Sequence, residues 1–135
     1  MSEYLKRKID KYLFDWKTNP NHKPLIIKGA RQVGKTKSIE TFAEQNYESI
    51  VEINFAEDPV YKQIVENGYS AEVVIKNISR INPEARFIKG KTLIFFDEIQ
   101  EFPDITTSLK FFSLDGNYDV ICSGSMLGIH YKEIS

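Results

Sequence analysis

Residues 29–36, Gly-Ala-Arg-Gln-Val-Gly-Lys-Thr, decide the fold. They fit the pattern G-x-x-x-x-G-K-[ST], which is typical of a loop that holds phosphate groups. Glycine lets the backbone curl so that successive N–H groups point inward at phosphate oxygens, and the following helix adds the positive end of its dipole. In this pattern Lys35 reaches the terminal phosphates, and the hydroxyl of Thr36 is a ligand for Mg²⁺. We therefore predict that Gly29, Ala30, Arg31, Gln32, Val33, Gly34, Lys35 and Thr36 bind a nucleotide.

The residues on either side of this loop have the alternation of strands and helices that is typical of an α/β protein. Leu25-Ile26-Ile27 is a short apolar run that predicts a buried strand directly before the loop. Further strands are expected at 50–55, 92–96 and 118–122, and helices at 35–46, 59–67, 70–81 and from Pro103 to about Phe112. This order predicts a three-layer αβα fold, in which helices cover both faces of a parallel sheet.

A pair of carboxylates ends the strand expected at 92–96. Leu93-Ile94-Phe95-Phe96 is followed directly by Asp97 and Glu98. Buried charge is costly, so a buried strand does not normally end in this way for packing reasons alone. At the carboxyl end of a parallel strand the pair faces the ligand crevice. We expect Asp97 to hold Mg²⁺ and Glu98 to orient and activate the attacking water.

The strand expected at 118–122 is followed by Ser123-Gly124-Ser125. In a parallel sheet this tip is close to the terminal phosphate, so a serine hydroxyl there can contact the phosphate or the attacking water. We assign this role to Ser125, with Ser123 as the alternative; an ordinary polar turn is equally compatible with the sequence. Cys122 is interpreted as a small buried residue beside the site.

Residues 1–23 are expected to form an N-terminal amphipathic helix and a turn, ahead of a core at 24–135. Apolar residues recur at helical spacing in residues 3–17. The basic residues of this segment are interpreted as a solvated face, with phosphate or nucleic-acid contact as the alternative; they are Lys6, Arg7, Lys8 and Lys11.

The composition excludes several classes of protein. The chain of 135 residues has a net charge of −1, so no strong overall field attracts nucleic acid or membrane. A single cysteine and the absence of a long apolar run predict a cytoplasmic protein without membrane spans. His22 and His130 are far apart in the sequence, and we expect no His/Cys metal site.

Three motifs resemble a prokaryotic AAA+-like ATPase family. They are the loop at 29–36, Leu-Ile-Phe-Phe-Asp-Glu-Ile-Gln at 93–100 and Gly-Ser-Met-Leu-Gly at 124–128, and their spacing also matches. The resemblance covers essentially the whole chain and implies that ATP and Mg²⁺ are bound and that ATP is hydrolysed. It also implies relatives that act as rings, and hence a homo-oligomer.

Family members are much longer than this chain. The resemblance implies that the arginine finger, the lid and a C-terminal domain of undefined role follow Ser135. It also implies a sheet of order 5-1-4-3-2, so we expect the fifth strand to be missing, which leaves the strand at 25–27 as an unpaired edge.

Four alternatives to an active ATPase remain open. A nucleotide-binding module with little turnover differs from an ATPase only in rate. A GTPase-like switch normally carries Asn-Lys-x-Asp, which this chain lacks. A small-molecule kinase is disfavoured by Glu98, because a kinase uses the hydroxyl of its substrate rather than water as the nucleophile. A nucleic-acid-binding module would use the basic first helix, and an unknown protein partner is compatible with each alternative.

Overall fold

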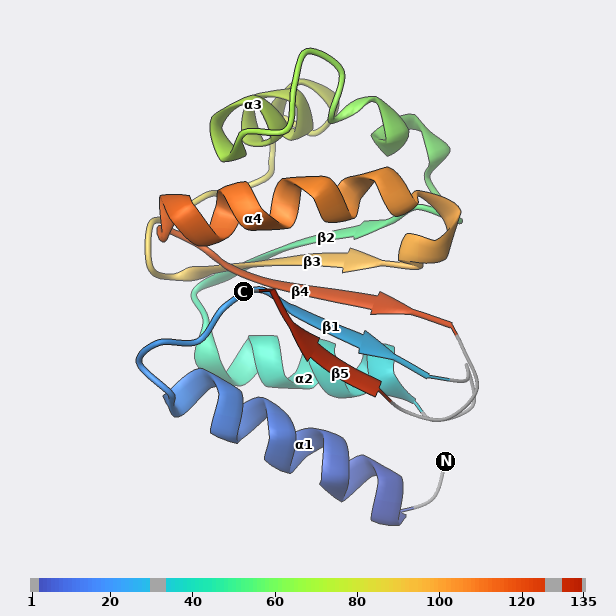
Figure 1. Cartoon of the computed structure of the whole chain (residues 1–135), viewed down its shortest axis with the longest axis vertical. Helices are drawn as coiled ribbons and strands as arrows, with labels where there is room; N and C mark the ends of the chain where they lie inside the picture. Colours follow the sequence, from blue (N-terminus) through green and yellow to red (C-terminus); the bar gives the residue numbers. More distant parts are fainter. Residues whose placement is uncertain (1–2, 30–33, 126–129, 135) are drawn as a thin grey trace.

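Five strands form one sheet in the order β2-β3-β4-β1-β5, shown in Figure 1. The structure is a computed structural model that describes residues 3–29, 34–125 and 130–134. The strands are β1 (Leu25–Lys28), β2 (Ser49–Asn54), β3 (Thr92–Asp97), β4 (Asp119–Gly124) and β5 (His130–Glu133). The first four strands are parallel to one another, and β5 is antiparallel to β1. The expected α/β fold is confirmed.

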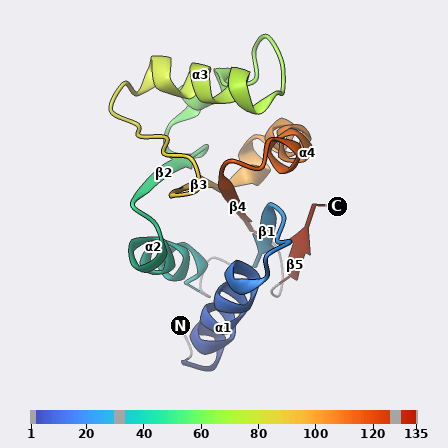
Figure 2. The same cartoon turned by 90° about the vertical axis from the view of Figure 1, so that its left-hand side faces the viewer.

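Helices cover both faces of this sheet, as Figures 1 and 2 show. On one face lie α1 (Glu3–Thr18) and α2 (Lys35–Asn46), and on the other lie α3 (Ala71–Ile81) and α4 (Thr106–Asp115). No helix in the described part of the chain is both long and apolar enough to cross a bilayer.

The central strand β3 shows why the sheet needs two helical layers. All six of its residues are buried, and successive side chains point to opposite faces. Leu93 and Phe95 belong to the core beneath α1 and α2, whereas Ile94 and Phe96 belong to the core beneath α3 and α4. A strand that is covered on both faces has a continuous apolar run, as this one does.

Helix α1 packs into the same core as α2 through Ile9, Leu13 and Trp16. Its exposed lysines form ion pairs with aspartates one turn further along. Lys6 lies 3.4 Å from Asp10, and Lys11 lies 2.7 Å from Asp15. These pairs partly neutralise the basic run, as on an ordinary solvated helix face.

Asp119, at the start of β4, ties the first helical layer to the sheet. Its carboxylate accepts hydrogen bonds from His22 Nε2 and from the hydroxyl of Tyr47, both at 2.6 Å. Burial, and then the charge and hydrogen bond of Asp119, raise the pKa of Tyr47. The other ring nitrogen of His22 lies 2.7 Å from the carbonyl oxygen of Asn19. The start of β4, the turn before β1 and the end of α2 are thereby held together.

The expectation that the sheet lacks a fifth strand, with β1 as an open edge, is wrong. β5 pairs with β1 from Leu25↔Glu133 to Lys28↔His130. Its neighbours also hold it in place, because the ring of Tyr131 stacks on that of Tyr12 with centroids 3.8 Å apart. The strand order is the expected one, and β5 is antiparallel because the link from β4 is too short for the crossover that a parallel strand requires.

The helix expected at 59–67 is also only partly present. A short 3-10 helix, η2, covers Pro59–Gln63, and turns follow it. Asn67 and Gly68 have positive φ angles of 75° and 135°, which α-helical residues do not adopt. These two residues separate η2 and the turns after it from α3, which begins with Ser70 as its N-cap.

Candidate functional site

The segment predicted to bind phosphate begins directly after β1 and ends in the first turn of α2. Gly34 precedes the helix with φ 71° and ψ 25°, a left-handed conformation that glycine adopts without steric cost. Gly29 donates its N–H to the carbonyl oxygen of Gly124 at 3.0 Å, which ties the start of the loop to β4. The predicted ligands Ala30, Arg31, Gln32 and Val33 lie outside the described residues.

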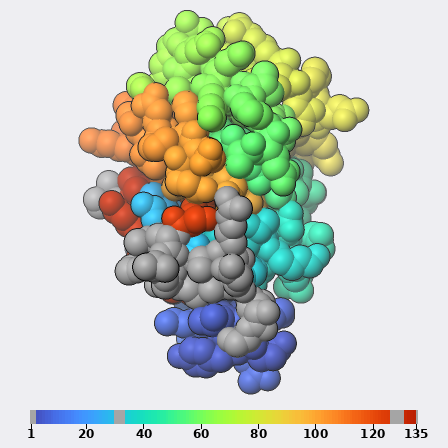
Figure 3. Space-filling view, turned by 90° about the vertical axis from the view of Figure 1, so that its right-hand side faces the viewer, coloured from blue at the N-terminus to red at the C-terminus, as the bar shows by residue number. Residues whose placement is uncertain are grey.

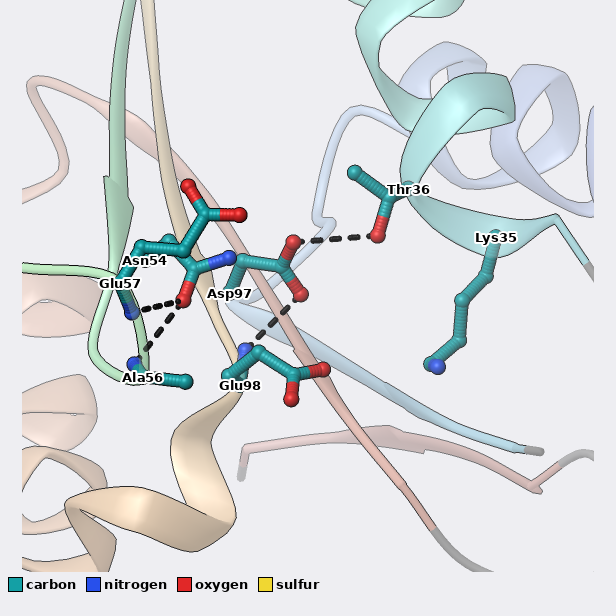
Figure 4. Close-up of a pocket in the computed structure, with 7 residues that line it drawn as sticks. All are labelled: Lys35, Thr36, Asn54, Ala56, Glu57, Asp97 and Glu98. Carbon is teal, nitrogen blue, oxygen red and sulfur yellow. Dashed lines mark hydrogen bonds between the residues drawn. The ribbon is translucent and has the colours of Figure 1, made fainter. Parts of the chain in front are cut away.

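Lys35 and Thr36 form the first turn of α2, so they lie at the positive end of the helix dipole. Lys35 is only 3% exposed. Its side chain extends toward the space between the helix and the strand ends in Figure 4. A buried ammonium at a helix N-terminus is suited to bind an anion.

Asp97, the last residue of β3, is 3% exposed and faces α2. The hydroxyl of Thr36 donates a hydrogen bond to its Oδ2 at 3.0 Å, and the backbone N–H of Glu98 donates to its Oδ1 at 2.8 Å. Burial raises the pKa of Asp97, although these two hydrogen bonds oppose the shift. The two predicted motifs, 61 residues apart, therefore meet in one contact.

This contact fits a magnesium ion. Mg²⁺ binds oxygen ligands, commonly a hydroxyl and one or two carboxylates together with water. Thr36 and Asp97 supply such oxygens side by side, and the burial of Asp97 makes a nearby cation favourable for its ionised form. Among the described lining residues, three carboxylates (Glu57, Asp97 and Glu98) accompany one ammonium, that of Lys35.

Glu98 has a backbone conformation that is uncommon for a residue with a side chain. Its φ of 57° and ψ of 48° are left-handed, which costs about 1–2 kcal/mol relative to the right-handed conformation. Directly after it, the 3-10 helix η3 (Ile99–Glu101) buries Ile99. The sharp turn lets Asp97 point at α2 while Glu98 enters the cavity, as Figure 4 shows.

A cavity of about 380 Å³ lies between the start of α2 and the ends of β2 and β3. It brings together four of the predicted residues and three others that the sequence motifs do not indicate. The lining residues are Lys35, Thr36, Asn54, Ala56, Glu57, Asp97 and Glu98.

Asn54 ends β2 and lies opposite Asp97 in the register of the two strands. Its side-chain oxygen accepts hydrogen bonds from the N–H groups of Ala56 and Glu57, at 2.9 and 3.0 Å. The turn thus formed places Ala56 and Glu57 on the cavity wall. A polar residue next to the last position of the strand expected at 50–55 was the available signal for Asn54.

The two candidate serines at the end of β4 differ in burial. Ser123 is fully buried within the sheet, and Ser125 is half-buried beyond the strand end. Within the described part of the chain, neither hydroxyl has a hydrogen-bond partner. Figure 3 views the edge at which the parallel strands end, where the segment after β3 (orange) lies beside the tip of β4 (red-orange).

Comparison with known proteins agrees with this geometry. A family model described as an AAA domain matches residues 21–135. The chain belongs to this family. It is therefore a nucleotide-binding, ATPase-like domain, and the predicted resemblance is confirmed.

No curated protein matches the chain. Among solved structures, the AAA domain resembles PCH-2 of C. elegans with 17% sequence identity and a TM-score of 0.48. That match covers 93% of this chain and 35% of the other, so this chain spans about a third of the length of PCH-2.

A pair of acidic side chains beside the cavity makes the stability of the AAA domain depend on pH. Glu52 of β2 is hydrogen-bonded to Glu40 of α2, and burial together with the charges of Glu40, Asp97 and Glu57 raises the pKa of Glu52 from an ordinary 4.5 to about 8. The folded chain holds this proton more tightly than the unfolded chain does. The free energy of unfolding must therefore fall as the pH rises from 4.5 to 8.

Glu52→Gln is expected to remove this pH dependence. The amide stays neutral and can still donate to Glu40, so the variant should be more stable than the wild type near pH 8 and similar to it near pH 5. Glu52 is only partly buried, so water screens its carboxylate and the gain in stability will be smaller than the full pKa shift implies. Urea unfolding across this pH range measures the change in the free energy of unfolding. Glu44→Gln, which changes an exposed glutamate of α2, is the control. If the free energy of unfolding varied with pH in the same way for Glu52→Gln and the wild type, the assignment of this pH dependence to Glu52 would be contradicted.

Proposed function

We propose that this AAA domain binds ATP together with Mg²⁺ and hydrolyses it. The observation that carries the proposal is the hydrogen bond of 3.0 Å between Thr36 and Asp97. It joins the phosphate-loop motif to the acidic motif in the cavity that Lys35 and Glu98 also line. A loop that merely contained glycine and lysine would not require a buried carboxylate at this position.

Each lining residue has a distinct role in the proposed reaction. The N–H groups of the loop at 29–36 and the ammonium of Lys35 hold the phosphates. Thr36 and Asp97 hold the magnesium ion, which when bound neutralises charge on the phosphate oxygens.

The proposed hydrolysis needs an activated water. Its oxygen attacks the γ-phosphorus, the bond from that phosphorus to the bridging oxygen breaks, and ADP leaves with the bonding electrons. Glu98 accepts the proton of the attacking water. The hydroxyl of Ser125 is proposed to contact the terminal phosphate, because Ser125 lies beyond the end of β4 whereas Ser123 lies within the strand; the hydroxyl oxygens of both serines are buried.

Calorimetric titration with ATP and Mg²⁺, followed by phosphate release from the same sample, tests this function. We expect saturable binding of ATP, weaker binding of GTP and slow release of phosphate. Binding without release would support a nucleotide-binding module that does not turn over, and a folded chain that binds no nucleotide would contradict the proposal.

Oligomerisation remains a proposal that follows from the family. Because β5 covers β1, the edge of β1 offers no site for a second copy. A ring would have to use other surfaces.

A further inference from the structure

Gln100 forms hydrogen bonds to two parts of the site that belong to separate sequence motifs. Its Nε2 donates a hydrogen bond to Oε2 of Glu98 at 2.9 Å, and its Oε1 accepts one from the backbone N–H of Ser125 at 3.2 Å. The carboxylate can only accept and the N–H can only donate, so the orientation of the amide is determined by its partners.

Gly124 makes this bridge sterically feasible. A Cβ atom at this position would lie 3.1 Å from Cγ1 of Ile99 and 3.3 Å from Oε1 of Gln100. Both separations are tighter than ordinary van der Waals contacts. The absence of a side chain therefore lets η3 approach the end of β4 closely enough for Gln100 to reach Ser125.

The backbone on the other side of the bridge is equally constrained. Glu98 is left-handed, and this turn folds η3 back so that Gln100 faces the side chain of Glu98. Ile99 between them is 3% exposed and belongs to the core beneath α3 and α4. The backbone of η3 is thus held in place by the buried Ile99, and the side-chain amide of Gln100 links Glu98 to Ser125.

The geometry points to Gln100 as a positioning residue that couples the carboxylate of Glu98 to the tip of β4. This inference rests on the proposed function, in which Glu98 activates water and Ser125 contacts the terminal phosphate. A shift of the Ser125 backbone on phosphate binding is transmitted through the amide to Glu98.

Gln100→Ala and Gln100→Glu test the role in catalysis. The first removes the bridge, and the second replaces the donor toward Glu98 by a carboxylate that repels it. Because a displacement of about 1 Å can cost roughly a hundredfold in rate, we expect kcat to fall by about 10- to 100-fold in both variants. The Kd for ATP with Mg²⁺ should stay within about twofold of the wild type.

Glu101→Gln is the matched control, because Glu101 is an exposed residue of the same 3-10 helix. It should leave both kcat and Kd unchanged. Gly124→Ala should lower kcat in the same direction as Gln100→Ala, since it forces η3 away from β4. Wild-type kcat in Gln100→Ala, or an equal loss of binding and turnover, would overturn the positioning role.

Amide NMR spectra of the nucleotide-free chain test the coupling independently of any ATPase activity. Glu98→Gln should shift the Ser125 amide resonance in the wild-type background and leave it unchanged in the Gln100→Ala background. An equal shift in both backgrounds, or none in either, would overturn the coupling. If the NMR spectra show the coupling but titration shows that the chain does not bind ATP, the proposed function is wrong and the bridge stands. The two failures are therefore distinguishable.

Discussion

Lys35→Ala is expected to weaken the binding of ATP with Mg²⁺ by roughly 10- to 150-fold. This range corresponds to the loss of about 1.5–3 kcal/mol for a hydrogen bond to a charged group. Lys35 is 3% exposed and lines the cavity with Thr36 and Asp97. Its ammonium is therefore already desolvated, and its contact with a phosphate is correspondingly strong. Isothermal titration calorimetry measures the change in Kd directly.

Lys37→Ala is the matched control for this variant. Lys37 lies two residues further along α2, and its side chain is exposed to solvent. It should leave the Kd within about twofold. Because Lys35 is buried, urea unfolding of both variants must show that the fold is intact. An unchanged Kd in folded Lys35→Ala would place the phosphates elsewhere and remove the basis of the proposed function.

Glu98→Gln is expected to lower the rate of phosphate release by about 10²- to 10⁴-fold, the usual contribution of a general base. The amide cannot accept the proton of the attacking water. It has nearly the same shape as the carboxylate, and glutamine and glutamate have similar access to the left-handed backbone at this position. ATP binding should therefore remain within about threefold of the wild type. Single-turnover measurements separate the chemical step from product release.

The control for Glu98→Gln is again Glu101→Gln, which removes an acid from the same short segment without touching the cavity. Phosphate release at the wild-type rate in Glu98→Gln would exclude Glu98 as the base. In that case Glu57, an exposed acid that also lines the cavity, would be the next residue to replace.

The central part of the site could be predicted because each motif predicts a local structure from residues that are close in the sequence. The spacing of Gly34, Lys35 and Thr36 predicts the start of a helix, and four apolar residues before Asp97 predict the end of a buried strand. In a parallel sheet the carboxyl ends of strands share one edge. These local features were therefore enough to expect that Thr36 and Asp97 meet, as they do.

The remaining wall of the cavity could not be predicted in this way. Asn54 lies opposite Asp97 only because β2 pairs with β3 in one particular register. Gln100 reaches Ser125 only because Glu98 is left-handed and Gly124 lacks a side chain. Nothing in the local pattern specifies either contact, because both depend on how separate segments pack.

The class of fold and the candidate residues of the site could be read from the sequence itself, and the strand order followed from the resemblance to the family. The class of fold and the candidate residues could be predicted because hydrophobic periodicity and motif spacing act over a few residues at a time. Only the tertiary structure decided that β5 closes the edge of β1, that Asn54 and Glu57 line the cavity, and that Gln100 joins Glu98 to β4. Hydrogen bonds between distant segments form only after the sheet has brought those segments together.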